Sequence, residues 1–166
     1  MLFRSNANGF MPGEGAGALW VGAVEAHSPQ LLCTGIGFGR EPAPIDSGEP
    51  LRAEGLTLAI KASLGEAGRE PHDMDFRITD NSGEQYYFKE ASLALSRTLR
   101  QRKEVFDIWH PAECTGEAGA TSGVAVIAAA REACVKGYAP GAKVLTHWAN
   151  DAGQRAAVTL EYRVAA

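Results

Sequence analysis

Three side chains in the sequence have the chemistry of an acid/base set: His110, Glu117 and His147. An imidazole titrates near neutral pH and a carboxylate can exchange protons with it, so the three suit general acid/base catalysis if the fold brings them together. His110 and Glu117 flank the start of one predicted helix, and His147 lies beside the last predicted loop. Each histidine also has a structural alternative, since His110 can cap a strand end before Pro111 and His147 can pack in a half-buried strand. Both interpretations stay open.

The cysteines do not indicate a metal or disulfide site. Cys33, Cys114 and Cys134 are odd in number and have no paired spacing. Neither a zinc knuckle nor a disulfide framework is predicted from such a set. We expect reduced thiols in a cytoplasmic protein, and no metal or cofactor site.

The stretch TGEAGATSGVAVIAAA, residues 115–130, predicts a helix that begins with small residues and continues with apolar ones. A helix of this composition packs closely against a neighbour, and we expect it to be buried on most sides. Free backbone N–H groups at its start can hold an anion or a carbonyl oxygen. Packing alone also explains the pattern, because small-residue helices are usually part of a core.

Two glycine patterns precede this helix, GEGAG at residues 13–17 and GIGFG at residues 35–39. A dinucleotide fingerprint needs its glycines between a strand and a helix, whereas GIGFG continues into a turn region. Close approach of strands is the better explanation for these glycines. Residues 16–27 and 31–39 are both compatible with strands, and together they predict a hairpin within residues 1–41.

The remaining elements alternate between helices and strands. Helices are predicted over residues 51–67 and 83–103, with residues 80–82 as N-cap candidates for the second and its basic C-terminal end in solvent. Strands are predicted over residues 75–79, 105–110, 143–149 and 155–164. This order over residues 51–166 predicts an α/β fold with a mixed sheet covered by helices. The whole chain, residues 1–166, is expected to be a single domain.

The bulk composition excludes several classes of partner. The chain has 166 residues, is 45% hydrophobic and carries a net charge of −4, which fits one domain with a sizeable core. No long basic run suggests nucleic acid or an anionic membrane surface as a partner. No apolar run approaches the length of a membrane span, and the start lacks the apolar core of a signal peptide. These features predict a cytoplasmic location.

Three segments in order resemble the C-terminal part of the β-ketoacyl synthases, the 3-oxoacyl-ACP synthases of the thiolase-like superfamily. NGFMPGEGAGALWV is similar to the family's GF-GEGAG strand, TGEAGATSGVAVIAAA to its TGH-GAAG helix start, and WANDAGQRAAVTLEY to its final GFGG strand pair. The resemblance implies a fold of two stacked α/β halves. This chain would supply the second half, preceded by a hairpin from the first.

The sequence departs from the family at every position that the resemblance marks as catalytic. The family's first histidine would fall within residues 78–83, around Asn81, and its second aligns with Glu117. The lysine shortly before the second histidine aligns with Ala112, and the terminal glycine loop has become NDAGQ, with Asp151 and Gly153. The nucleophilic cysteine of the family belongs to the first half.

These departures predict a non-catalytic ketosynthase-like protein that acts as a scaffold, accessory or adaptor. A carboxylate at Glu117 would repel the negative charge that develops in condensation, where the family places a donor. A protein partner or a second copy would cover the apolar face left by the missing half. The resemblance also extends to degenerate ketosynthase-like proteins found beside type VI secretion effector genes, with terminal segments similar to THWANDAGQRAA.

The alternative is one part of a condensing or acyl-transfer enzyme whose cysteine-bearing half is on another chain or missing. An acyl carrier protein would be a partner only under this alternative. A third interpretation is a fragment of a longer protein, since the chain starts in the middle of a family motif.

Overall fold

The computed structural model describes residues 8–164. Helices and strands follow one another as β1 Gln30–Arg40, α1 Glu54–Ala67, the 3₁₀ helix η1 Pro71–Asp73, β2 Phe76–Thr79, α2 Gln85–Thr98, β3 Ile108–Trp109, α3 Ala112–Thr115, α4 Thr121–Val135, β4 Lys143–Ala149 and β5 Gln154–Arg163. The α/β alternation predicted after residue 51 is therefore confirmed.

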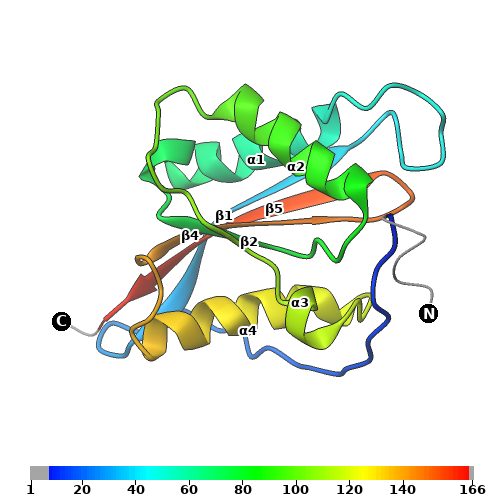
Figure 1. Cartoon of the computed structure of the whole chain (residues 1–166). Helices are drawn as coiled ribbons and strands as arrows, with labels where there is room; N and C mark the ends of the chain where they lie inside the picture. The colour runs from blue at the N-terminus through cyan, green and yellow to red at the C-terminus, as the bar shows by residue number, and fades with distance from the viewer. Residues whose placement is uncertain (1–7, 165–166) are drawn as a thin grey trace.

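The five strands form one mixed sheet in the order β1-β5-β4-β2-β3. Strand β2 runs parallel to both β3 and β4, whereas β5 pairs antiparallel with β4 on one side and with β1 on the other. Figure 1 shows α1 and α2 on one face of the sheet and α3 and α4 on the other. The result is a three-layer arrangement with the carboxyl ends of β2 and β4 at the same edge.

Each face of the sheet has its own hydrophobic core. On the α1 and α2 face, Leu56 and Ile60 of α1 pack with Ala94 of α2 and Leu145 of β4. On the α4 face, one cluster joins the buried side chains Phe76, Ile78, Val126, Ala130, Val144 and Leu160. Successive strand residues alternate between these clusters, as the two-residue period of a strand requires.

The predicted N-terminal hairpin is wrong. Residues 16–27 form no strand, and β1 pairs with β5 at the other end of the chain. The segment before β1 instead passes along α4, as Figure 1 shows, and a single bridge joins Pro12 to Glu117. A Cβ at Gly13 would lie 2.0 Å from the carbonyl oxygen of Thr115, so this glycine serves the approach of the segment to the end of α3 and not to another strand.

The glycines of β1 also serve a helix. A Cβ on Gly37 would lie 2.0 Å from the carbonyl oxygen of Ala59, and α1 therefore lies directly on the strand. The neighbouring side chains Ile36 and Phe38 point to the opposite face, where they are 46% and 74% exposed. The face of β1 that α4 would have to cover is thus open.

Two further expectations need correction. Only Val126, Ala130 and Ala133 of α4 are buried, so the helix is not enclosed on most sides. The basic end predicted for α2 is not wholly in solvent either. The half-buried Lys103 donates to the carbonyl oxygens of His72, at 3.0 Å, and Met74.

Element boundaries also differ from prediction. Helix α2 ends at Thr98, and the predicted strand over residues 105–110 shrinks to β3. None of residues 80–82 caps α2; its N-cap is Glu84, and Asn8 Oδ1 accepts a hydrogen bond of 2.8 Å from Gln85 N. The capping group therefore comes from a segment far away in the sequence.

Candidate functional site

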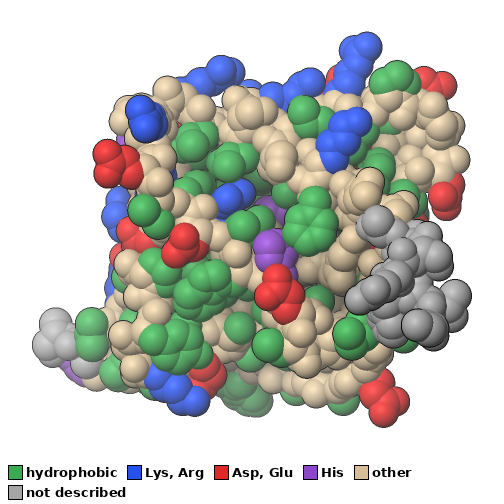
Figure 2. Space-filling model, viewed as in Figure 1, with side chains coloured by type: hydrophobic (Ala, Val, Ile, Leu, Met, Phe, Trp, Pro, Cys, Tyr) green, Lys and Arg blue, Asp and Glu red, His purple; other side chains and the backbone are tan. Residues whose placement is uncertain are grey.

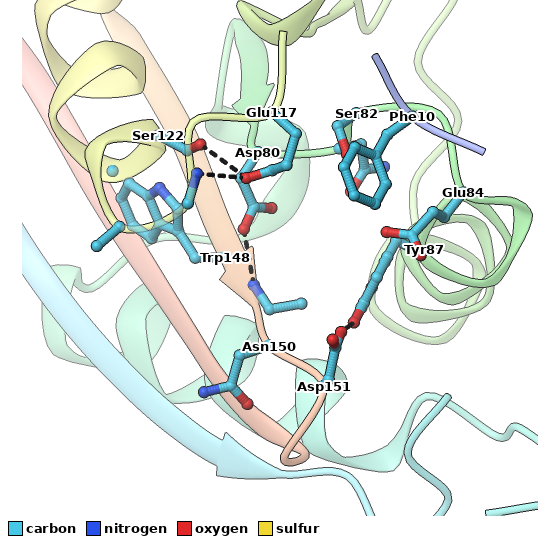
Figure 3. A pocket seen from close by; sticks show the side chains of 15 residues that line it. Phe10, Asp80, Ser82, Glu84, Tyr87, Glu117, Ser122, Trp148, Asn150 and Asp151 are labelled. Carbon is cyan, nitrogen blue, oxygen red and sulfur yellow. Dashed lines mark hydrogen bonds between the residues drawn. The ribbon is translucent and has the colours of Figure 1, made fainter. Parts of the chain in front are cut away.

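A pocket of about 610 Å³ lies at the edge of the sheet where β2 and β4 end. Loops that follow β2 and β4 and the residues that begin α4 line it, together with Phe10 and Tyr87. Figure 3 shows the side chains of Asp80, Glu117, Trp148 and Asp151 around its interior. The ends of neighbouring strands in an open α/β sheet are a common place for a binding site.

Glu117 occupies the start of α4 with its own carboxylate. Its Oε1 accepts hydrogen bonds from the backbone N–H of Gly119, at 2.8 Å, and from the hydroxyl of Ser122, at 3.3 Å. The sequence predicted that N–H groups here can hold an anion or a carbonyl oxygen. Two donors at the start of α4, Gly119 N and Ser122 Oγ, instead donate to the carboxylate of Glu117.

Asp80 lies at the end of β2 and is held by β4. Its Oδ2 accepts a 3.0 Å hydrogen bond from the backbone N–H of Ala149. Desolvation, with a smaller contribution from the negative charge of Glu117, raises the pKa of Asp80 to about 7 against the lowering effect of the backbone hydrogen bonds. Asp80 therefore exchanges its proton near neutral pH.

The opposite wall of the pocket carries two more carboxylates. The hydroxyl of Tyr87 donates a hydrogen bond to Asp151 Oδ1, and desolvation followed by this bond raises the pKa of the tyrosine. Desolvation also raises the pKa of Glu84, with further contributions from the charges of Asp151 and Glu117. None of the lining side chains within residues 8–164 is Lys or Arg. The pocket is acidic.

The loop between β4 and β5 is closed by its own hydrogen bonds. Asn150 Oδ1 accepts from Gln154 N at 2.9 Å, and Asn150 Nδ2 donates to Gln154 Oε1 at 2.8 Å. Gly153 has a φ of +86°, which favours glycine, and its carbonyl oxygen accepts from Glu41 N at 2.8 Å. Gly153 therefore shapes the turn that presents Asp151, and it does not line the pocket.

The two histidines do not join Glu117 in the pocket. His147 is 3% exposed, and desolvation, with smaller effects from the charges of Arg77, His110 and Arg155, lowers its pKa to about 3. The ring of His110 lies 5.1 Å from that of Phe88, which places it against α2. Both imidazoles therefore lie on the α2 side of the sheet, away from the pocket wall formed by the start of α4.

His110 keeps only a weak link to a carboxylate. Its Nδ1 is 3.8 Å from Glu113 Oε1, and its Nε2 is buried without a hydrogen-bond partner among the described residues. Burial lowers the pKa of His110, and Glu113 opposes that shift. The backbone carbonyl of His110 accepts from Glu113 N at 3.0 Å at the start of α3.

The other predicted positions divide between the pocket and its surroundings. Asn81 lines the pocket, is 4% exposed, and has a buried Nδ2 with no hydrogen-bond partner among residues 8–164. Ala112 begins α3 and does not line the pocket. Its methyl group offers no donor or acceptor. Of the predicted set, Glu117, Asn81 and Asp151 are therefore brought together.

Sequence reasoning missed Asp80, Tyr87 and Trp148 as pocket residues. Asp80 was predicted to be a helix cap. A carboxylate directly after a buried strand, in a chain that alternates strands with helices, is the signal that could have placed it at the sheet edge. Trp148 follows Val144 and Thr146 at two-residue intervals in β4, so the strand period puts it on the same face, the one that α4 covers.

No group of three or more metal-ligating side chains occurs within residues 8–164. None of the described helices is long and apolar enough to cross a bilayer.

The comparison with known proteins identifies the fold. No protein-family profile and no curated protein matches the sequence. Among solved structures, the ketosynthase in complex with its chain length factor from Xenorhabdus doucetiae matches with a TM-score of 0.70 at 13% identity, over 82% of this chain and 40% of that one. An oxazolomycin ketosynthase domain of Streptomyces albus matches with a TM-score of 0.69 at 14% identity, over 82% of this chain and 30% of that one.

A similar match extends to 3-oxoacyl-[acyl-carrier-protein] synthase III from Aquifex aeolicus, with a TM-score of 0.54 at 14% identity, over 80% of this chain and 54% of that one. The mixed five-stranded sheet with its helices is thus half of a thiolase-like, ketosynthase-like fold. The chain spans about two fifths of the length of the first ketosynthase that it matches.

Proposed function

We propose that this protein is a non-catalytic ketosynthase-like scaffold or adaptor that works by binding another protein. The observation that carries the proposal is the carboxylate of Glu117, which accepts the hydrogen bonds of Gly119 N and Ser122 Oγ at the mouth of α4. Condensation needs free donors where an oxyanion develops. Here two donors are engaged by a carboxylate, and a second carboxylate, that of Asp80, lies nearby.

The cysteines also support a non-catalytic role. Partial desolvation raises the pKa of the thiols of Cys33, an exposed residue, and of the half-buried Cys134, which lowers their thiolate fraction. Cys114 is exposed on α3, and it does not line the pocket. None of the three combines a pocket position with the features that activate a nucleophile.

The exposed apolar side chains support a protein partner. Trp20 is 98% exposed and Val21 87% exposed on the segment beside α4, and Phe38 is 74% exposed on the open face of β1. Exposed apolar groups of this kind favour association. Solved structures with the same fold include a ketosynthase bound to its chain length factor, and a partner or second copy would occupy this face. A type VI secretion effector is the partner class that the sequence resemblance suggests.

The catalytic side of the proposal is tested by intact-mass measurement after incubation with an acyl thioester or a cerulenin-type electrophile. We expect no stoichiometric adduct at any cysteine. Stoichiometric labelling of Cys114 that a Cys114→Ser variant abolishes would overturn the non-catalytic role.

The partner side is tested by sedimentation of the protein and by pull-down from its native source. We expect a dimer or a hetero-oligomer that a Trp20→Ser, Phe38→Ser double variant weakens. Val105→Ser is the matched control, because Val105 is 66% exposed elsewhere. A dilute monomer that captures no partner would contradict the adaptor role.

The second candidate is one part of a condensing or acyl-transfer enzyme that acts with an acyl carrier protein. The observation that favours it is the partial coverage of the ketosynthases that the chain resembles. Condensing activity that appears only when a cysteine-bearing partner chain is added, and that Asp80→Asn or Glu117→Gln abolishes, would favour this candidate over the adaptor.

A further inference from the structure

A second cavity lies on the other side of the sheet from α4, along α2. It is a groove of about 330 Å³ between this helix and the ends of β2 and β3. Its lining residues are Arg77, Phe88, Ala91, Ser92, Leu95, Ser96, Leu99 and Ile108. Figure 2 shows hydrophobic side chains gathered between α2 and α4 on this face, with basic and histidine side chains among them. The groove shares no lining residue with the acidic pocket.

Arg77 is the one charged side chain among these lining residues. Its Nη2 donates to the carbonyl oxygen of Phe106 at 3.0 Å, and its guanidinium carbon lies 4.7 Å from the centre of the Phe106 ring. Its Nε is buried and has no hydrogen-bond partner among residues 8–164. A buried N–H without an acceptor is unfavourable, and more so on a charged group.

The charge of Arg77 also lacks a counter-ion. No ion pair within residues 8–164 includes it, and burial lowers its pKa. A second cation adds to the positive potential, because Lys103 Nζ lies 4.9 Å from the centre of the same Phe106 ring. The chain therefore leaves the half-buried cation of Arg77 unpaired beside an apolar groove, whereas the fully buried Arg155 is paired with Glu90 at 2.8 Å.

We propose that this groove binds a small monocarboxylate with an apolar tail. The carboxylate would pair with the guanidinium of Arg77, which lines the groove and has no counter-ion within residues 8–164, and such charge-assisted pairs are the strong ones. The tail would lie against Leu95, Leu99 and Ile108. A volume near the lower end of ligand sites fits a short aliphatic acid better than a long one. This site is separate from the proposed adaptor surface, so either proposal can fail alone.

The test is a titration of the full chain with hexanoate, followed by two-dimensional NMR of methyl and Arg side-chain signals. Hexan-1-ol and hexylamine, of the same length but neutral or positive, are compared in parallel. We expect saturable shifts at Leu95, Ile108 and Arg77 Hε with hexanoate and much weaker ones with the other two. No saturable shift with hexanoate at millimolar concentration, or equal binding of the alcohol, would overturn the proposal.

Two variants and a control sharpen the test. Arg77→Met should weaken hexanoate binding about tenfold or more, as expected for the loss of a hydrogen bond between charged groups, and should remove the preference over hexan-1-ol. Ser92→Phe should fill the groove and weaken all three probes. Arg97→Met, on the exposed side of α2 and outside the groove, should leave binding unchanged.

A loss with Arg97→Met as large as that with Arg77→Met would show attraction to surface charge in place of a site, and would overturn the proposal. If Arg77→Met does not fold, Ser92→Phe decides, because Ser92 is exposed on α2. Unchanged hexanoate binding by that variant would likewise overturn it.

Discussion

The acidic pocket and the groove beside α2 differ in whether their charged groups already have partners. In the pocket, Glu117 accepts from Gly119 N and Ser122 Oγ, and Asp80 accepts from Ala149 N. In the groove, the buried Nε of Arg77 has no partner among the described residues. The carboxylates of the pocket are therefore engaged by donors of the chain itself, while Arg77, which lines the groove, has no counter-ion within residues 8–164.

The comparison teaches that charge alone does not mark a binding site. The charge of Glu117 contributes to the raised pKa values of Asp80 and Glu84, yet each of Asp80, Glu117 and Asp151 is held by the chain's own donors. A partly buried cation without a counter-ion is unfavourable and needs an explanation. Substitutions in the two regions should therefore have different consequences.

The largest expected effect concerns α2, which carries residues of both regions. Glu90 and Arg155 are 1% and 2% exposed, and Arg155 Nε lies 2.8 and 2.9 Å from the two carboxylate oxygens. Glu90→Gln would leave a buried guanidinium unpaired. We expect the free energy of unfolding in urea to fall by about 3–5 kcal/mol.

The matched control for Glu90→Gln is Glu132→Gln. Glu132 pairs with Lys136 at 3.4 Å on the surface of α4, and its loss should change the free energy of unfolding by less than about 1 kcal/mol. Equal effects of the two substitutions would show that the buried pair does not anchor α2.

The next largest effect is a pH dependence of the free energy of unfolding, which we expect for a substitution in the pocket. Because the pKa of Asp80 is raised to about 7 in the folded chain, the unfolded chain loses this proton first as the pH rises from about 4. The folded state is therefore progressively disfavoured up to about pH 7. Asp80→Asn keeps an acceptor for Ala149 N and removes this penalty.

We expect Asp80→Asn to raise the free energy of unfolding by roughly 1–3 kcal/mol at pH 8 relative to its effect at pH 4. Urea denaturation at the two pH values measures it. The control is Asp107→Asn, at an exposed position outside the pocket, which should show the same effect at both values. A pH-independent effect of Asp80→Asn would contradict the raised pKa.

The sequence predicted the framework of the fold but not its first pairing. Strand β4 has the predicted bounds, residues 143–149, because its apolar pattern and the turn after it are local signals. The prediction of a hairpin was wrong because residues 16–27 have a composition as compatible with a strand as that of β1. The partner of β1 is β5, and Gly37 pairs with Ala157 across most of the chain. Such long-range pairing leaves no local trace.

The site was predicted in part, for a reason that lies in strand geometry. Glu117 and Asp151 lie in loops at the sheet edge, where the resemblance placed them. His147 precedes the same loop, but neighbouring residues in a strand point to opposite faces, so Trp148 faces the pocket and His147 is buried on the other side. Arg77 gave no signal, because an unpaired donor is a property of the folded chain.

A smaller effect is expected where the groove loses its charge. Arg77→Met removes the hydrogen bond to the Phe106 carbonyl oxygen and the contact with its ring, but it also relieves a buried charge without a counter-ion. These terms oppose each other, so without ligand we expect the free energy of unfolding to change by about 1 kcal/mol or less. Urea denaturation beside Glu90→Gln measures the contrast. A loss as large as that of Glu90→Gln would show that Arg77 is a structural residue and weaken the distinction between the two regions.

The smallest effect tests the coupling within the pocket. The negative charge of Glu117 contributes to the raised pKa of Asp80, after the larger effect of desolvation. Glu117→Gln keeps an acceptor for Gly119 N and removes the charge, so the pKa of Asp80 should move down by less than burial moved it up. Carbon-detected NMR of the Asp80 carboxyl across a pH series measures the change. The control is Glu113→Gln, which should leave the pKa of Asp80 unchanged, because the side chain of Glu113 is 79% exposed on α3. If Glu117→Gln also leaves the titration of Asp80 unchanged, the two carboxylates do not share one pocket in solution, because a charge removed at that range would be felt by its neighbour.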